Sequence, residues 1–407
     1  MLELFIMRQR FVFATIGILV GVIGTYLLVS SLCKPERGFS VWKTDDVSDG
    51  YTLIAPYYGG TQFSEPGAVH LIDTAGTIVH SWKTRFTTLI AYLLPNGHIY
   101  AAMTPPLDMR DYPSGGSTGL IQELDWDGTV VWEYEDRQMT HDFEVMPDGG
   151  IAYVRWNLAP QSFAHNVQGG MRTASTSVWT NEIVVVNREK EITWTWKAED
   201  HLDPNDFELS PLVPRTDWMH VNAIRYLEKN PLTHTPVFLI TARHLSRALM
   251  IEIETGTVIW MSPKDVVALP HDATLTQTGT ILMFDNGLFR NSPLPVLMSG
   301  AVEIESRLNE VTWAWNGGSS VIEKMQFASH FMSGAQRLPN GNTLITASPL
   351  NRVLEVTPEG AIVWNYTNDW RDEEGRMHIM FKVRKYEAEG TEWGRWISPS
   401  IGSWCPR

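Results

Sequence analysis

The chain repeats one alternating pattern of apolar and polar positions six times. Each copy runs from a turn, through β-branched residues spaced two apart, to an aromatic residue. Glycine and asparagine at most of the turns tolerate the positive φ of a hairpin corner. The alternation predicts a strand after each turn. The turn positions lie 51 to 66 residues apart, at Gly76, Gly128, Lys190, Gly256, Asn309 and Gly360.

A second turn follows most copies and leads into an apolar strand. It carries Pro-Asn-Gly or Pro-Asp-Gly in LLPNGHIYAA, VMPDGGIAYV and RLPNGNTLIT, and Thr-Gly in LTQTGTILMF. Each unit therefore holds about four short strands in roughly 50 residues, which is the period of a propeller blade. The pattern predicts an all-β fold, a six-bladed β-propeller over residues 67–387.

Tryptophans recur at the ends of these strands, and the chain contains 17 of them. A single blade cannot bury both of its faces, so neighbouring blades must cover one another. We therefore interpret the regular tryptophans as packing between blades. Two longer gaps between strands, 157–180 and 199–217, are polar and contain proline. They predict long loops, which are often functional in compact folds.

An uncharged apolar run of 22 residues, Phe11–Leu32, precedes the repeats. A helix of this length spans about 30 Å, the thickness of the hydrocarbon layer. We predict a transmembrane anchor at 11–33, with the propeller on the extracytoplasmic side of the membrane; a cleaved signal segment is the alternative. The remaining segments are predicted to be a flank (1–10), a linker (34–66) and a C-terminal tail (388–407).

Charge and cysteine content exclude some partners. The formal net charge of −14 argues against nucleic acid, because phosphate binding needs clustered lysine and arginine. Cys33 and Cys405 are too few for a disulfide scaffold or a thiolate metal site. Their pairing and the oligomeric state stay open.

Polar residues open several of the predicted inner strands, where the blades of a propeller converge. His141, His271 and Ser333 each stand eight residues before the glycine of the second turn. His220 opens the corresponding strand of the third repeat, and His330 lies three residues before Ser333. A lone histidine here usually has a structural role. Recurrence at one pseudosymmetric position predicts instead that these side chains meet at one end of the channel.

Two more residues are predicted beside the histidines. Arg243 ends the apolar strand FLITAR, where a guanidinium is costly unless it meets an anion or a carboxylate. Asn222 shares a strand face with His220, because positions i and i+2 point the same way.

Acidic residues adjoin the same positions. Asp142 and Asp272 directly follow two of the histidines, and either cap the strand starts or take part in catalysis. We interpret Asp285 and Asn286, in LMFDNG, as a turn.

Several imidazoles beside one guanidinium suit a limited range of chemistry. Imidazole can act as a nucleophile, as an acid or base near neutral pH, or as a metal ligand. An arginine disfavours a divalent cation and favours sulfate, phosphate or carboxylate. We therefore predict no metal and no cofactor.

The stretches around these residues resemble the arylsulfate sulfotransferase family. They are THDF with His141, DWMHVNAI with His220, LITARHLS with Arg243, PHDATLTQTGTILMFDNG with His271, and SGAQRLPNGNTLI from Ser333. They occur in order over nearly the whole predicted propeller. The resemblance implies a membrane-bound or exported enzyme that moves a sulfuryl group from a phenolic sulfate ester to a phenolic acceptor.

The resemblance also implies a role for each residue. His271 matches the nucleophile that carries the sulfuryl group as a sulfohistidine. His220, Asn222 and Arg243 match residues that hold the sulfuryl oxygens, and His141 matches the histidine that handles the phenol proton. We add Ser333 and His330 as candidate substrate contacts at the same end of the channel.

This chain departs from the larger family members. It has no N-terminal β-domain between the apolar segment and the repeats, and so resembles a compact branch of the family. It also contains no GxxxxGK[ST] loop, which argues against a nucleotide sulfate donor.

Two other function classes stay open. A non-catalytic, membrane-anchored propeller that binds a ligand or acts as a scaffold would explain the repeats and the anchor, but not the convergent histidines and arginine. The other class is a different propeller enzyme, dependent on a metal or a quinone. Quinone-type propellers usually use more blades and acidic calcium ligands, which this sequence does not show.

Overall fold

The computed structural model describes residues 40–41, 44–57, 65–111, 115–290, 298–371 and 375–397. The predicted flank (1–10) and transmembrane anchor (11–33) lie outside the described residues. Within the described ranges, no helix has both the length and the apolar character needed to cross a membrane.

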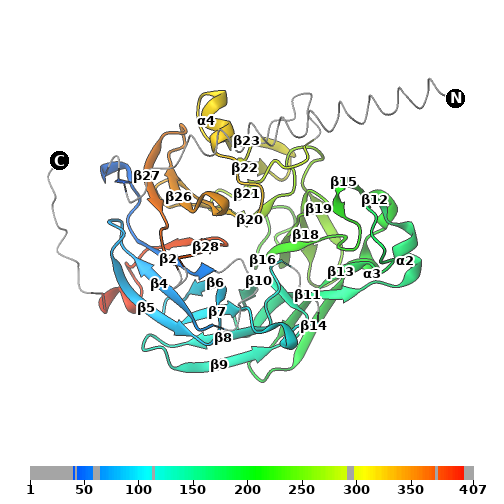
Figure 1. The fold of residues 1–407 in the computed structure, drawn as a ribbon, viewed down its shortest axis with the longest axis horizontal. Coiled ribbons are helices and arrows are strands. Elements are labelled where there is room, and N and C mark those ends of the chain that lie inside the picture. Colours follow the sequence, from blue (N-terminus) through cyan, green and yellow to red (C-terminus); the bar gives the residue numbers. More distant parts are fainter. Residues whose placement is uncertain are drawn as a thin grey trace.

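Six antiparallel sheets of four main strands surround a central axis, which confirms the predicted all-β, six-bladed β-propeller (Figure 1). We number the blades in chain order and name the innermost strand of each first. Blade 2 contains β6 (Thr88–Leu93), β7 (Ile99–Met103), β8 (Leu120–Leu124) and β9 (Val130–Glu135). Blade 3 contains β10 (Met139–Val145), β11 (Ile151–Leu158), β13 (Trp179–Val186) and β14 (Ile192–Lys197). Blade 4 contains β16 (Val221–Leu227), β17 (Val237–Ala242), β18 (Arg247–Glu252) and β19 (Val258–Met261).

The last two blades in chain order repeat this plan. Blade 5 contains β20 (His271–Leu275), β21 (Ile281–Asp285), β22 (Gly300–Glu305) and β23 (Glu310–Trp315). Blade 6 contains β24 (Gly334–Arg337), β25 (Thr343–Ala347), β26 (Arg352–Val356) and β27 (Ile362–Thr367). Strand β1 (Ser40–Val41) pairs with the outer edge of β27. The short helix α4 (Val321–Gln326) follows β23.

Blade 1 combines strands from both ends of the propeller. Its innermost strand, β29 (Arg384–Tyr386), pairs with β2 (Tyr51–Ile54), which is followed outward by β4 (Gly67–Ile72) and β5 (Ile78–Thr84). A second pair, β3 (Pro56–Tyr57) with β28 (Ile379–Met380), accompanies this closure. The propeller therefore begins before residue 67, and part of the expected linker (34–66) is blade. The pairing joins residues over 300 positions apart, which a local strand pattern does not reveal.

The regular tryptophans lie on the outermost strands and connect each blade to the next. Each indole N–H donates a hydrogen bond to the turn of the following blade, so the ring packs and also satisfies its polar atom. The bonds run from Trp82 to Asp125 O, Trp132 to Arg188 O, Trp196 to Gly256 O, Trp260 to Asn309 Oδ1, Trp315 to Gly360 O, and Trp364 to Thr74 O. The last bond joins blade 6 to blade 1. The tryptophans are thus interblade packing residues, as the repeat predicts.

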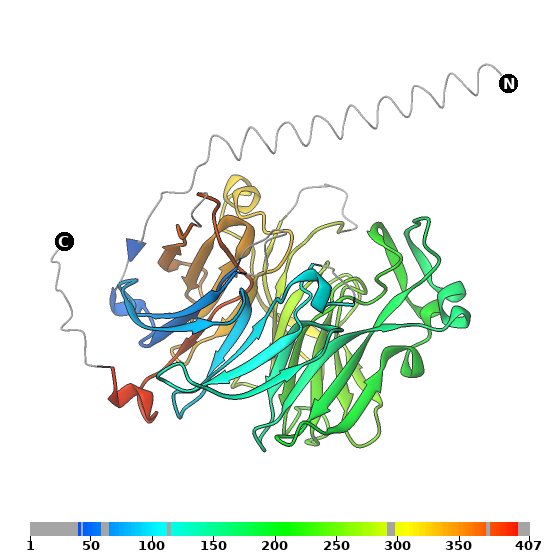
Figure 2. The same cartoon turned by 60° about the horizontal axis from the view of Figure 1, so that its bottom comes forward.

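The two predicted long loops are partly ordered into one projection beside the propeller (Figure 2). The first contains α2 (Gln161–Asn166) and β12 (Gln168–Met171), and the second contains α3 (Ala198–His201) and β15 (Glu208–Pro214). Strands β12 and β15 pair in parallel. The projection leads directly into Asp217 and Trp218, next to the candidate site.

Candidate active site

The inner strands present their first residues at one mouth of the channel. His141 lies in β10, His220 directly precedes β16, His271 begins β20, and Ser333 directly precedes β24. Arg243 follows β17, and its backbone N–H donates to the carbonyl of His220. Because β17 runs antiparallel to β16, its end lies beside the start of the inner strand.

Bulges set these strand starts apart from a regular ladder. The register shifts in β10, β16 and β20 fall at or beside His141, His220 and His271. His141 and His220 adopt φ of 52° and 51°, and Asp272 adopts 61°. Such left-handed backbone is uncommon outside glycine and costs conformational energy, which the surrounding contacts must offset. Bulges redirect side chains, and in β10 and β20 they separate the histidine from the aspartate that follows it.

The four predicted catalytic residues come together at this mouth. The imidazole centroids of His141 and His220 are 4.6 Å apart. Burial lowers the pKa of His271, and the charge of Arg243 together with nearby His220 and His141 lowers it further. Burial and Arg243 likewise lower the pKa of His220. All three imidazoles are therefore neutral at neutral pH, beside one cation.

His271 is held in a single tautomer. Its Nδ1 lies 2.6 Å from Asn286 Oδ1. The other end of that amide is unambiguous, because Asn286 Nδ2 donates to the carbonyls of Ser329 and Met332. Oδ1 can only accept, so His271 carries its proton on Nδ1. The lone pair of Nε2 is therefore available as a nucleophile.

Asn286 is a site residue that the sequence interpretation as a turn missed. It does follow β21 at a turn, and Asp285 accepts two backbone N–H groups there, from Ala268 and Gly287. The side chain of Asn286, however, reaches back to His271, the first residue of β20. The sequence did contain a signal for this contact. In an antiparallel pair the end of the second strand lies beside the start of the first, so a polar residue after β21 can reach a histidine that begins β20.

His220 and Asp217 form a short pair. Nδ1 of His220 lies 2.5 Å from Asp217 Oδ2, and both side chains are mostly buried. Burial raises the pKa of Asp217 to about 6, although His244 and Arg243 oppose the shift. When Asp217 is protonated, its hydroxyl can donate to Nδ1 of His220, and the neutral imidazole then carries its own proton on Nε2. The pair can therefore accept or donate through Nε2.

Arg243 is positioned by His244, which sequence reasoning did not single out. His244 Nδ1 lies 2.6 Å from the carbonyl oxygen of Asp217 and donates to it, because a carbonyl can only accept. Its Nε2 then accepts from Arg243 Nη1 at 2.8 Å. Burial lowers the pKa of His244 to about 3, so it stays neutral. Burial lowers the pKa of Arg243 to about 10, and the guanidinium stays charged at neutral pH.

His141 faces the same mouth from β10. Its Nδ1 lies 2.6 Å from Thr140 Oγ1, which in turn donates to the carbonyl of Gly116. His141 Nδ1 therefore donates, and Nε2 keeps its lone pair. Gly116 has φ of 84°, and a Cβ there would lie 2.2 Å from His141 Nε2. Only glycine fits against this imidazole.

Asn222 lies in the bulge of β16. Its Nδ2 donates to the carbonyl of Pro270, the residue before His271. Its Oδ1 is buried and has no hydrogen-bond partner among the described residues. Asn222 thus supports the peptide that enters β20, and its predicted contact with the sulfuryl oxygens stays a prediction.

Ser333 and His330 lie at the same end of blade 6. The Ser333 hydroxyl is buried, lies 2.7 Å from Ser329 Oγ and donates to the carbonyl of Phe331. These bonds stabilise a turn with φ of 83° at Ser333. His330 is partly exposed, and burial together with Arg243 lowers its pKa. Contact of either residue with a substrate stays a prediction.

The C-terminal strand segment forms the floor of the site. The Phe381 ring lies 6.1 Å from the His141 ring and 6.2 Å from the His271 ring, centroid to centroid. Phe381 is buried and lies between β28 and β29. In Figure 1, β28 crosses the middle of the ring of blades. The site is therefore complete only when the end of the propeller domain closes on its beginning.

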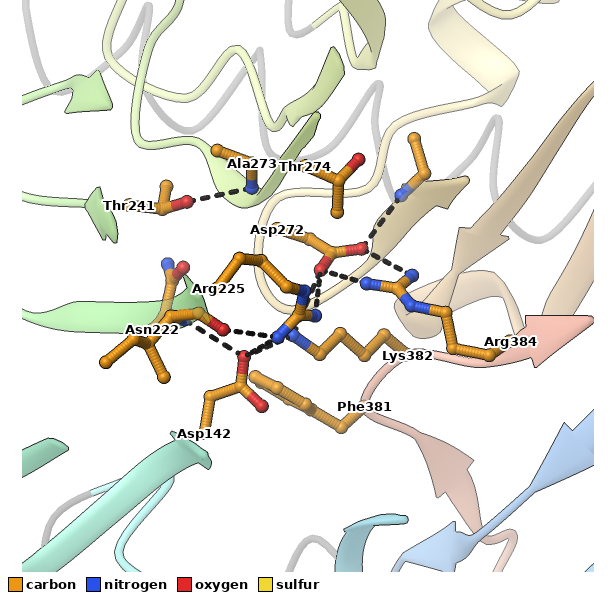
Figure 3. Close-up of polar contacts among 12 residues, drawn as sticks. Asp142, Asn222, Arg225, Thr241, Asp272, Ala273, Thr274, Phe381, Lys382 and Arg384 are labelled. Atoms are coloured by element: carbon orange, nitrogen blue, oxygen red, sulfur yellow. Dashed lines mark hydrogen bonds and ion pairs between the residues drawn. The ribbon is translucent and has the colours of Figure 1, made fainter. Parts of the chain in front are cut away.

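Below this floor, the aspartates after two of the histidines form an ionic hub (Figure 3). Asp272 accepts from Arg384, Lys382 and Arg225, and from the backbone N–H of Ala335. Asp142 accepts from Tyr92, Lys382 and Arg225, and from the backbone N–H of Ile224. Burial alone would raise the pKa of Asp272, but the three cations outweigh it and lower that pKa. The contacts of the hub join residues from all six blades, so it does more than cap a strand start, and it lies outside the mouth that the histidines share.

One group within the described ranges has the composition of a metal site. Ligand atoms of Asp217, His220 and His244 lie within 4.8 Å of one another. Nδ1 of each imidazole already contacts Asp217, and Nε2 of His244 accepts from Arg243. The adjacent guanidinium would repel a divalent cation. The donor set therefore fits a hydrogen-bonded relay better than a metal.

The chain is similar to several solved propeller structures at low sequence identity. One is a protein of unknown function from Bacteroides caccae, with 14% identity, a TM-score of 0.48, and coverage of 83% of this chain and 99% of that chain. Another is a virginiamycin B lyase from Staphylococcus aureus, with 11% identity, a TM-score of 0.41, and coverage of 82% and 88%. A third is a periplasmic gluconolactonase from Pseudomonas aeruginosa, with 10% identity, a TM-score of 0.43, and coverage of 83% and 99%.

No curated protein matches the chain in a sequence comparison. A family model does match it, over residues 109–369, which is more than half of the 407 residues. The matched range contains every predicted catalytic residue. The family is described as arylsulfotransferase, in agreement with the resemblance of the motifs, and the chain belongs to the arylsulfotransferase family.

Proposed function

We propose that the protein transfers a sulfuryl group from a phenolic sulfate ester to a phenolic acceptor, through a sulfohistidine at His271. The observation that carries the proposal is the state of that side chain. Asn286 holds its proton on Nδ1, burial and Arg243 keep it neutral, and Nε2 is left as the nucleophile. Membership of the arylsulfotransferase family supports the class of reaction.

In the first half-reaction, His271 Nε2 attacks the sulfur of the ester. The N–S bond forms as the S–O bond to the aryl group breaks, and the phenolate leaves with the bonding electrons. Negative charge on the sulfuryl oxygens faces Arg243, which His244 holds in place. Preorganised donors of this kind typically supply about 3–4 kcal/mol each. His220 adds an N–H when its pair with Asp217 is protonated.

In the second half-reaction, the oxygen of the acceptor phenol attacks sulfur and the N–S bond breaks. Neutral His271 is restored with its proton still on Nδ1. The phenol proton passes to the lone pair on Nε2 of His141. The other ring nitrogen of His141, Nδ1, donates to Thr140. His141 then passes this proton to water, and its low pKa favours that release.

We also propose that the segment 11–33 anchors the protein in a membrane, with the propeller on the extracytoplasmic side. The support is the length and uncharged character of Phe11–Leu32. Fractionation of cells that express the full chain, followed by protease treatment of intact and permeabilised cells, tests both points. Recovery of the chain in the cytosolic fraction would contradict the anchor.

The reaction is tested with a chromogenic aryl sulfate and a phenol, using the wild type and His271→Ala. We expect release of the chromophore that depends on the acceptor, formation of the new sulfate ester, and loss of both in the variant. Mass spectrometry after incubation with donor alone should show a sulfuryl group on the peptide that contains His271. Equal turnover by both proteins would exclude His271 as the nucleophile. Loss of activity with a chelator would instead favour the metal-dependent alternative.

A further inference from the structure

A cavity lies at the opposite end of the channel from the mouth that the histidines share. It has a volume of about 520 Å³. Its walls come from the ends of β6 and β10 and from the turns after them, whereas the catalytic residues lie at the strand starts. The apolar part of the wall contains Leu93, Leu94, Val145 and Met146. The cavity is therefore separate from the proposed active site.

The polar part of this wall belongs to the ionic hub. Arg225 and Arg384 line the cavity, and their side chains are 12% and 9% exposed. Together with Lys382, they supply three positive charges. Asp142 and Asp272 supply only two negative charges (Figure 3). A buried cluster with one unbalanced charge is costly, so a third anion is needed to neutralise it.

Glu144 is the third carboxylate at this cavity. Its Oε2 lies 3.5 Å from Arg225 Nη1, which is longer than a good charge-assisted hydrogen bond. Its side chain is 26% exposed and lies in the cavity wall. The two aspartates bond to the same cations at distances near 3 Å or less. Glu144 is therefore a loose counterion that an external anion could replace.

We propose that this cavity binds a small organic carboxylate, which takes the place of ionised Glu144 as the third counterion of Arg225, Lys382 and Arg384. The carboxylate would face Arg225 and Arg384, and its apolar body would contact Leu93, Leu94 and Met146. Ligand sites commonly combine such apolar walls with a few convergent polar groups. The proposal does not depend on the reaction at the other mouth.

Binding is coupled to a proton on Glu144. Burial raises the pKa of Glu144 to about 7, against the attraction of Arg225. Above that pH the ionised side chain competes with the ligand, and below it the neutral acid leaves the positive charge free. The charged and titratable groups that face Glu144 are Arg225, Arg384, Lys382, Asp142 and Tyr386. Since only Glu144 titrates near neutral pH among these, carboxylate affinity should fall about tenfold between about pH 6 and about pH 8.

The experiment is calorimetric titration of the purified protein with benzoate, whose carboxylate stays ionised over this range. We expect binding at about pH 6, weaker binding at about pH 8, and uptake of a proton at the higher pH in buffers of different ionisation enthalpy. Glu144→Gln keeps the positive charge uncovered, and should bind at the higher pH about tenfold more tightly than the wild type. The matched control, exposed Glu189→Gln, should keep the wild-type pH dependence. Benzyl alcohol, which lacks the charge, should not bind.

Two variants locate the ligand. Leu94→Trp or Met146→Trp fills the cavity and should abolish benzoate binding, with the thermal midpoint used to confirm folding. Arg243→Ala removes the cation of the catalytic mouth and should leave binding intact. No binding to the wild type at about pH 6, or loss of binding in Arg243→Ala, would overturn the site. A wild-type pH dependence in Glu144→Gln would overturn the role of Glu144.

Discussion

At the scale of single residues, the site depends on side chains that orient other side chains. Asn286 contacts His271, the proposed nucleophile, only through Nδ1, yet it decides which nitrogen of His271 carries the proton. His244, the next residue in the chain, holds the guanidinium of Arg243 in place by accepting a hydrogen bond from it. Catalytic groups in such sites owe their activity to a fixed tautomer as much as to their identity.

Replacement of Asn286 tests this orientation. In Asn286→Ala, His271 can rotate or carry its proton on Nε2, so we expect kcat to fall on the order of 100-fold with little change in KM. Steady-state kinetics with an aryl sulfate measures both constants. The exposed Asn166→Ala should behave as the wild type. Unchanged kcat in Asn286→Ala would show that the amide has no role in orientation.

The raised pKa of Asp217 gives a prediction about stability. Its folded pKa of about 6 lies above the usual value of 3.8, so the folded state binds the proton more tightly than the unfolded state does. That contribution is complete below the unfolded pKa and is lost as pH rises through about 6. The difference in unfolding free energy between the wild type and Asp217→Asn should thus decrease by about 2.4 kcal/mol from about pH 4 to about pH 7.

Urea unfolding of both proteins across this pH range gives the difference directly. The comparison between two variants cancels the pH dependence of all other groups. Asp108→Asn, an exposed change of the same kind, should run parallel to the wild type. A constant difference for Asp217→Asn would mean that this carboxyl titrates normally in the folded protein.

At the scale of secondary structure, bulges at the starts of β10 and β20 let two consecutive residues, a histidine and an aspartate, contact different parts of the molecule. In β10 and β20, the histidine faces the mouth of the channel. The aspartate after it faces the hub (Figure 3). A regular strand also alternates its faces, but the bulge adds the left-handed backbone seen at His141 and Asp272. The hub thereby supports the strand starts that carry the proposed catalytic histidines.

Removal of one hub carboxylate should destabilise the whole domain. Asp272→Ala leaves Arg384, Lys382 and Arg225 with a single buried aspartate, and we expect a loss of about 3–5 kcal/mol in unfolding free energy. The surface pair of Asp111 and Arg137 is the contrast, with side chains 43% and 56% exposed. Asp111→Ala should cost less than about 1 kcal/mol. Denaturant unfolding that shows equal effects of the two changes would contradict the importance of the hub.

At the scale of the whole molecule, closure of the ring decides whether the site exists. Phe381, Lys382 and Arg384 come from the segment that completes blade 1, and they form the floor and the hub. The indole of Trp364 joins blade 6 to blade 1 through the carbonyl of Thr74. The pairing that closes the ring therefore both stabilises the domain and completes the candidate site.

The closing contact can be weakened without a change at the site. Trp364→Phe removes the hydrogen bond to Thr74 and some buried volume, so we expect a loss of about 1–3 kcal/mol in stability. Trp396→Phe changes a tryptophan that is 48% exposed and should alter stability by less than about 0.5 kcal/mol. Thermal and denaturant unfolding measure both. A shift of similar size in the two variants would argue against a special role for the contact between blades 6 and 1.

The sequence alone determined the repeating parts of this protein. Strand alternation, the turn residues and the regular tryptophans predicted six blades, because each blade repeats the same local constraints at a readable spacing. The same register predicted that His141, His220 and His271 meet at one end of the channel. Arg243 was predicted beside them from its position at the end of an apolar strand. Motif resemblance predicted the family, and the family comparison confirms it.

Only the tertiary structure decided which residues meet across the repeats. The pairing of β29 with β2 and the ionic hub join different repeats. The orientation of His271 by Asn286 and the relay from Asp217 through His244 to Arg243 join neighbouring segments within one blade. Local periodicity specifies the face on which a side chain lies, but not its partner on another strand. Partners are chosen by burial, because a polar group removed from water must find its hydrogen bonds wherever the closed ring places them.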